Sequence, residues 1–100
     1  FLVPSLYEMA AEEGHIEAQF RLGTMLCFGE LNGLIDKVQA YMMFNIAAMN
    51  GHETAISNRD VMVGELTSEE IEKGQSLARQ CVEKNFKECI CWECLKPAAN

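Results

Sequence analysis

The sequence predicts an all-α fold, an α/α superhelix or solenoid in which antiparallel helix-turn-helix repeats stack on one another. Three observations lead to this prediction. Apolar residues recur at spacings of three and four, and no segment alternates convincingly with period two. Glycines divide the chain into segments of helical length joined by short turns. A shift of 37 residues also brings two of these turns into register.

Length and composition indicate one folded domain without long polar tracts. The chain has 100 residues, of which 49% are hydrophobic, and this excludes an intrinsically disordered chain. The formal net charge is −7, which argues against binding to nucleic acid or to an anionic membrane surface. No apolar run approaches the roughly 20 residues needed to span a bilayer, so no membrane insertion is expected. Because the sequence begins at Phe1, we expect a processed or excised chain, either cytoplasmic or, after signal-peptide removal, periplasmic or secreted.

The first two helices are expected over residues 5–13 and 15–28. Gly14 ends the first one, because glycine readily adopts the left-handed conformation of a helix stop. Gly29 closes the second in the same way. The second helix carries one apolar stripe at helical spacing, formed by Ala18, Leu22, Met25 and Leu26.

Three further helices are expected over residues 37–50, 52–65 and 68–84. Asp36 is a suitable N-cap for the first of these. Thr67 begins a capping box, because a glutamate follows three residues later. After residue 84 the pattern decays, and only a short final helix within 86–95 is expected.

The turns around Gly14 and Gly51 are nearly identical. Residues 10–15 read Ala-Ala-Glu-Glu-Gly-His, and residues 47–52 read Ala-Ala-Met-Asn-Gly-His. Small residues are needed where two helix backbones approach closely, and glycine is needed where the chain reverses within one or two residues. A period in the thirties with these features is typical of a helix-turn-helix solenoid.

These positions resemble a Sel-1-like repeat, a relative of the tetratricopeptide repeat. Leu26 and Met43 stand where the family has an aromatic residue and a tryptophan, and in the second repeat Arg59-Asp60 replaces Leu-Gly. Residues 67–82 resemble the closing helix of such arrays. The matching positions are Ala18, Leu22, Gly23, Gly29, Asp36, Ala40, Ala47, Ala48, Gly51 and Ala55.

The resemblance implies four parts of the chain. Residues 1–14 correspond to the trailing helix of a preceding repeat, and residues 15–51 form one repeat. Residues 52–84 form a degenerate, terminal repeat, and residues 85–100 form a Cys-rich tail.

In this family architecture the first helix of each pair lines a concave face. The implied function is a non-enzymatic scaffold that binds a protein or peptide partner there, without a cofactor. Phe20 would be a natural peptide anchor, although it could instead pack on the helix at 5–13. The residues expected on this face are Phe20, Thr24, Cys27, Ser57 and Val61.

Catalytic groups are scarce. No nucleophile elbow, phosphate loop or His-Glu-x-x-His motif occurs. His15 and His52, the only histidines, follow helix-ending glycines and are expected to start their helices. One alternative class stays open, a small enzyme or binder of cell-wall fragments, which would need a concave polar pocket.

The cysteines offer a second alternative, a metal-binding or redox module. Cys81, Cys89, Cys91 and Cys94 could together provide four thiolates for zinc, or they could form disulfides. The state we expect is free thiols on a loose tail. Cys27 is expected to act as a small buried apolar residue.

Overall fold

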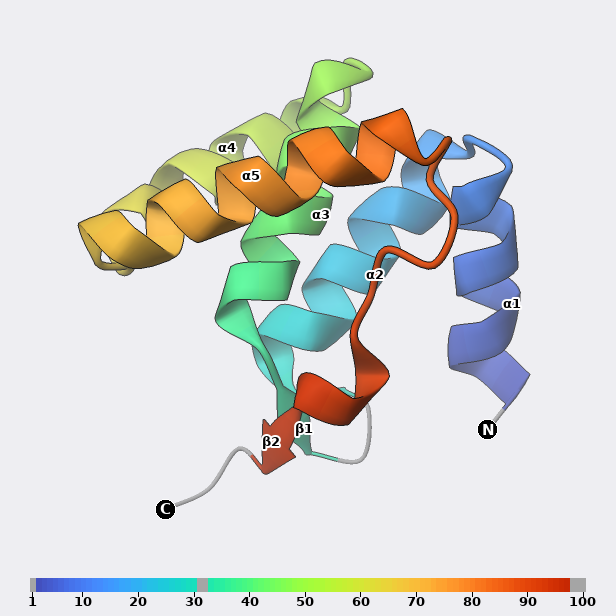
Figure 1. The fold of residues 1–100 in the computed structure, drawn as a ribbon, viewed down its shortest axis with the longest axis horizontal. Helices are drawn as coiled ribbons and strands as arrows, with labels where there is room; N and C mark the ends of the chain where they lie inside the picture. The colour runs from blue at the N-terminus through green and yellow to red at the C-terminus, as the bar shows by residue number, and fades with distance from the viewer. Residues whose placement is uncertain (1, 31–32, 98–100) are drawn as a thin grey trace.

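The computed structural model describes residues 2–30 and 33–97, with side chains over 7–30 and 33–95. Within these residues the fold is all-α, as predicted, and the chain can be followed from the N-terminal helix to the C-terminal strand in Figure 1. Two short strands pair antiparallel near the C-terminal end, with Leu34 opposite Pro97. The elements are α1 (Leu2–Glu12), α2 (Ile16–Phe28), β1 (Leu34–Ile35), α3 (Lys37–Met49), α4 (Glu53–Val63), α5 (Ser68–Glu83), the 3-10 turn η1 (Trp92–Cys94) and β2 (Lys96–Pro97).

The five predicted helices are confirmed, and α2 to α5 lie within two residues of the expected bounds. Helix α1 starts earlier than expected and includes Pro4 in its first turn, where a missing backbone N–H costs nothing. Of the short final helix expected within 86–95, the structure has only the 3-10 turn Trp92–Cys94. Asn85 and Phe86 have positive φ angles of 55° and 64°, which end α5 and turn the chain back.

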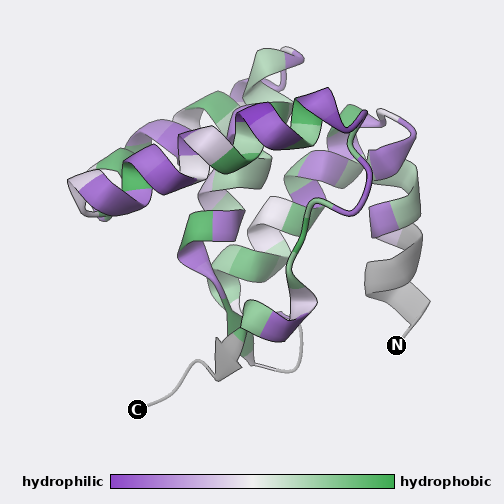
Figure 2. Ribbon diagram, viewed as in Figure 1, coloured by the Kyte–Doolittle hydropathy of each residue, from purple (hydrophilic) through white to green (hydrophobic). Residues whose placement is uncertain are grey.

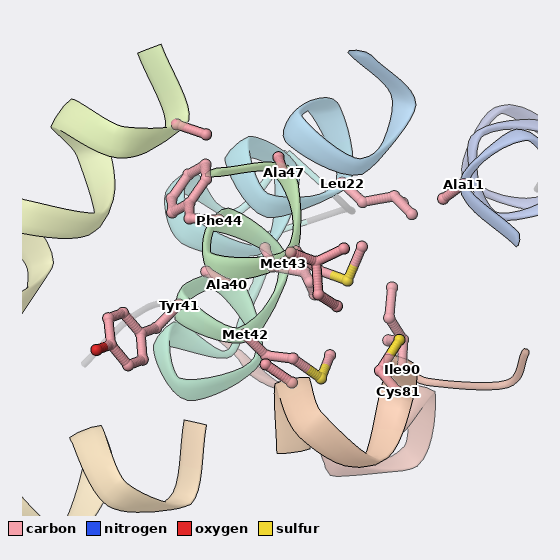
Figure 3. Close-up of a cluster of buried hydrophobic side chains, with 14 of the residues drawn as sticks. Ala11, Leu22, Ala40, Tyr41, Met42, Met43, Phe44, Ala47, Cys81 and Ile90 are labelled. Atoms are coloured by element: carbon pink, nitrogen blue, oxygen red, sulfur yellow. The ribbon is translucent and has the colours of Figure 1, made fainter. Parts of the chain in front are cut away.

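Helix α3 is the centre of the molecule. It packs against α2, α4 and α5, while α1 packs against α2. A helix that is apolar on all sides belongs in a core, and the ribbon of α3 is mostly hydrophobic while hydrophilic residues predominate on α5 (Figure 2). The core side chains around α3 appear in Figure 3. The buried α3 residues are Gln39, Ala40, Tyr41, Met42, Met43, Phe44, Ile46, Ala47 and Ala48.

Two glycines allow the neighbouring helices to approach α3 closely. A Cβ atom on Gly23 of α2 would lie 2.8 Å from Cδ1 and Cε1 of Phe44. A Cβ atom on Gly74 of α5 would overlap the ring of Tyr41. The two large rings of α3 therefore each sit on the bare backbone of a neighbouring helix.

The two similar turns of the sequence have the same geometry. Gly14 has a φ of 91° and Gly51 a φ of 95°, both in the left-handed region that favours glycine. The backbone N–H of the histidine after each glycine donates to the carbonyl five residues earlier, at 3.1 and 3.0 Å. This hydrogen bond belongs to the Schellman helix stop, and it recurs with the 37-residue shift.

The caps predicted at Asp36 and Thr67 are confirmed. Asp36 accepts a hydrogen bond at 3.0 Å from the backbone N–H of Gln39 and so starts α3. Thr67 and Glu70 exchange side-chain to backbone hydrogen bonds of 2.9 and 3.1 Å at the start of α5. These caps fix where α3 and α5 begin.

The C-terminal strap, residues 85–97, is not the loose tail that the sequence suggested. It runs from the end of α5 across α2 to β1, where β2 pairs with that strand (Figure 1). Ile90 is only 8% exposed and belongs to the core cluster. The expectation of four free thiols is also wrong, because Cys81 is bonded to Cys89 and Cys91 to Cys94. Residues 98–100 of the expected tail lie outside the described residues.

Polar contacts fasten this strap to α1 and α3. The buried amide of Gln39 donates to the carbonyl of Cys91 at 2.9 Å and accepts from its N–H. The indole N–H of Trp92 donates to Oε2 of Glu8 at 3.1 Å. Both the oxygen and the nitrogen of this amide are paired. Losing one partner would therefore be costly, because it would leave a buried polar group without a hydrogen bond.

Glu8 gives the strap contact a pH dependence. Burial raises the pKa of Glu8, and the carboxylates of Glu12 and Glu88 add to the rise, while the hydrogen bond from Trp92 opposes it. A carboxyl whose pKa is raised by folding stabilises the fold below its unfolded pKa. That contribution is lost as the pH rises through the folded pKa.

We therefore expect Glu8→Gln to gain melting temperature relative to the wild type as the pH rises from about 4 to about 7. Glutamine cannot ionise, and its amide oxygen still accepts from Trp92. Circular dichroism melts at several pH values measure the difference. Glu72→Gln on an exposed part of α5 controls for the loss of one negative charge. An advantage of Glu8→Gln that shrinks with rising pH would contradict the burial effect.

Candidate functional site

His52 links α4 to α2 and has no free ring nitrogen. Its Nδ1 accepts from the backbone N–H of Ala55 at 3.1 Å, which caps α4. Its Nε2 therefore carries the proton of the neutral ring and donates to Oε1 of Glu17 at 3.0 Å. This hydrogen bond lowers the pKa of Glu17. The bond at Nδ1 makes His52 the N-cap of α4, as predicted. Because both ring nitrogens are engaged, His52 is not positioned as a general base.

The ring of Phe20 lies under His52. The rings of Phe20 and His52 stack with centroids 4.2 Å apart. The ring of Phe44 on α3 has its centroid 5.9 Å from that of Phe20. Phe20 is half-buried and packs against the core cluster. One face of its ring is covered by the histidine at the start of α4.

An open groove lies between α2 and α4, with a cavity of about 180 Å³. We call it the α2/α4 groove. It is on the first helices of the two expected pairs, where the resemblance placed a concave binding face. Its lining residues are Cys27, Phe28, Lys37, Phe44, Asn58, Val61, Met62 and Glu65.

The floor of the groove is apolar and buried, and two of its wall residues are large, apolar and exposed. Phe44 and Met62 form buried parts of the lining, and both belong to the core cluster. Phe28 is 67% exposed and Val61 is 62% exposed. Two large exposed apolar side chains therefore border the same cavity, and apolar surface gathered in one place is typical of interaction sites.

The local sequence explains why this surface is uncovered. Within α4, Ala55 and Met62 are the buried residues among those described, so the rest of the helix faces outward. Phe28 is the last residue of α2, and Gly29 with φ of 74° turns the chain away directly after it. The side chain therefore ends the helix without a following residue to cover it.

One end of the groove carries an ion pair. Nζ of Lys37 lies 3.7 Å from Oε1 of Glu65, and both side chains are about half exposed. Such a pair contributes little to stability, but it supplies both charges to a bound segment. Burial raises the pKa of the Cys27 thiol, so this groove residue is a neutral thiol at pH 7 and not a nucleophile.

The structure brings two of the five predicted face residues into the groove. Cys27 and Val61 line it. Phe20 is stacked on His52 instead, and the hydroxyl of Thr24 donates to the carbonyl of Phe20 at 3.1 Å. Ser57 is exposed on α4.

Sequence reasoning missed Phe28, the most exposed of the large apolar side chains described. The signal in the sequence was its position immediately before Gly29. A glycine that ends a helix carries no side chain to cover the residue before it. It also missed Asn58 and Glu65, which lie one turn before and after Val61.

A second, wider hollow of about 440 Å³ lies between α3 and α5. Met49 and Val82 supply its exposed apolar surface, while four of its lining residues are polar or charged. The lining residues are Asn45, Met49, Gln75, Ala78, Arg79, Val82 and Glu83. It lacks an exposed aromatic side chain, the residue type that most often dominates binding energy.

The cysteine side of the molecule has no metal geometry in the part that the structure describes. Over residues 2–30 and 33–97, no group of three or more His, Cys, Asp or Glu residues is arranged to hold a metal ion. The four candidate ligands Cys81, Cys89, Cys91 and Cys94 are paired as two disulfides instead. No helix in the described part of the chain has the length and apolar character to cross a membrane.

Comparisons of the chain with family models, with curated proteins and with solved structures found no match.

Proposed function

We propose that this chain is a non-enzymatic peptide-binding module of the Sel-1-like repeat type, and that the α2/α4 groove holds one large apolar side chain of a partner peptide. The observation that carries the proposal is the exposed pair Phe28 and Val61 over the buried floor of Phe44 and Met62. The matching turn geometry at Gly14 and Gly51 supports the repeat assignment.

The size of the groove favours a peptide side chain over a free small molecule. Pockets for drug-sized ligands measure roughly 300–1,000 Å³, and this cavity measures about 180 Å³. That space accommodates one aromatic or branched side chain. An anchor of this kind in an apolar pocket is how most interfaces gain their binding energy.

Charge favours a partner with cationic residues beside the anchor. The formal net charge of −7 attracts positively charged segments and speeds their encounter. At the groove itself Glu65 offers a carboxylate that a lysine or arginine of the peptide can share. We therefore expect weaker binding at higher ionic strength.

A non-enzymatic role is supported by the state of the polar groups near the groove. The imidazole of His52 is used for capping and for the bond to Glu17. The thiol of Cys27 is held neutral by burial. Neither group has the base or the thiolate that nucleophilic catalysis requires.

The experiment is a selection of peptides on the purified protein. A phage library of random dodecapeptides is panned on the wild type, and enriched peptides are synthesised with a fluorophore. We expect them to share one large apolar residue. Their anisotropy-derived affinity should fall by at least about tenfold on Phe28→Glu and on Val61→Glu, since each places a charge at an apolar wall.

Met9→Glu is the matched control, because Met9 is a similarly exposed apolar residue on α1 away from the groove. It should leave the affinity unchanged, and all three variants should keep the wild-type melting temperature. Enriched peptides that bind Phe28→Glu and Val61→Glu as well as the wild type would overturn the groove. So would a selection that enriches no peptide with an apolar anchor.

A further inference from the structure

The two disulfides of the C-terminal strap differ in their surroundings. Cys81 is 2% exposed in the core cluster, and its partner Cys89 is half-buried. Cys91 and Cys94 are both exposed. Thiol–disulfide exchange requires the attacking thiolate to reach a sulfur atom, so access separates the two bonds.

We propose that Cys91–Cys94 is an exchangeable disulfide that accepts electrons from a dithiol reductant, while Cys81–Cys89 stays closed as the structural bond. The site is distinct from the α2/α4 groove. Cys94 also lines a hollow of about 190 Å³ at the start of α3, which gives a small reductant room to approach. Two residues separate the cysteines, the spacing of the Cys-x-x-Cys motif found at redox-active sites.

The strap keeps its position when this bond opens, because other contacts hold it on both sides. The amide of Gln39 holds the backbone of Cys91 through two hydrogen bonds. Trp92 is bonded to Glu8 between the two cysteines, and after Cys94 the strand β2 pairs with β1. None of these contacts uses a sulfur atom. Both thiols are therefore kept close enough to close again.

The exchange balances as a two-electron transfer. A thiolate of the reductant attacks Sγ of Cys91, the S–S bond breaks, and Sγ of Cys94 leaves with the electron pair and takes up a proton. The second thiol of the reductant, as thiolate, attacks its own sulfur in the mixed disulfide and expels Cys91, which is then protonated. The reductant ends as a disulfide and the protein as a dithiol. Attack at Cys94 gives the same products.

The test is a reduction series on the oxidised protein in native buffer with graded dithiothreitol. Samples are quenched with acid, alkylated with N-ethylmaleimide in denaturant and digested with trypsin. Cleavage after Lys84 and Lys87 places Cys81 and Cys89 on separate peptides that only their disulfide joins. We expect a species in which these peptides stay linked while Cys91 and Cys94 carry two maleimides. Opening Cys81–Cys89 should need at least about tenfold more dithiothreitol.

Two controls make the outcome decisive. The selectively reduced protein should keep its circular dichroism spectrum, and Cys91→Ser with Cys94→Ser should fold, retain the linked peptides and lose the two early maleimides. In urea the two disulfides should open at similar dithiothreitol concentrations, because unfolding makes both of them accessible to the reductant. Simultaneous opening of both bonds in native buffer, earlier opening of Cys81–Cys89, or unfolding on selective reduction would each overturn the proposal.

Discussion

Phe44→Ala is expected to lower the free energy of unfolding by about 3–5 kcal/mol, the usual cost of removing a buried aromatic ring. Phe44 is 1% exposed and lies on α3, the helix that the other elements surround. On the side of Gly23 its ring lies against bare backbone, which cannot move in to fill the cavity. A loss of this size is a large part of the stability of a small domain.

Urea denaturation followed by circular dichroism measures this loss. Phe28→Ala is the matched control, because it removes the same side chain from an exposed position at the groove wall. Exposed substitutions usually change stability by less than about 0.5 kcal/mol. Similar losses for the two variants would contradict the position of Phe44 in the core.

Removing Cys81–Cys89 is expected to be the second largest effect. The double variant Cys81→Ala with Cys89→Ala should lose about 2–4 kcal/mol, the range for a native disulfide. This bond turns the chain back after α5 and brings Ile90 into the core. Without it, the whole strap must be ordered by non-covalent contacts.

The comparison variant is Cys91→Ala with Cys94→Ala, which removes the exposed bond and closes a shorter loop. We expect a smaller loss there, because loop-closure entropy grows with loop length and because Gln39 and Trp92 still hold the strap. Urea melts of both double variants under non-reducing conditions provide the measurement. A larger loss from the exposed pair would contradict the assignment of the structural bond.

The helices and their ends could be predicted because their causes are local. Asp36, Thr67 and the glycines at 14, 29 and 51 act on neighbouring backbone groups through capping and left-handed turns. The central place of α3 was not predicted, although its buried residues lie on all sides of the helix.

The strap could not be predicted, because its contacts join residues far apart in the sequence. The two hydrogen bonds between Gln39 and Cys91 span 52 positions, and the bond between Trp92 and Glu8 spans 84. The spacing of residues along the chain does not predict contacts between positions so far apart. The pairing of four nearby cysteines is likewise ambiguous from spacing alone.

The candidate groove was predicted in part, for a related reason. Cys27 was predicted from the residues of α2 that lie off its apolar stripe, and Val61 from the 37-residue shift of Thr24. The structure places both at one cavity. The same logic did not show that His52, at the start of the next helix, stacks on the ring of Phe20. The residue pattern of one helix shows which side chains share a face, but it does not show which side chains of another helix cover them.

The most direct test of the proposed binding groove is a two-dimensional ¹H–¹⁵N NMR titration of the wild type with one selected peptide. We expect the shifted amides to gather on α2 around Cys27 and Phe28 and on α4 around Val61 and Glu65, and to be lost on Val61→Glu. Shifts centred instead on Met49 and Val82, or along the strap, would contradict the assignment of the α2/α4 groove as the binding site.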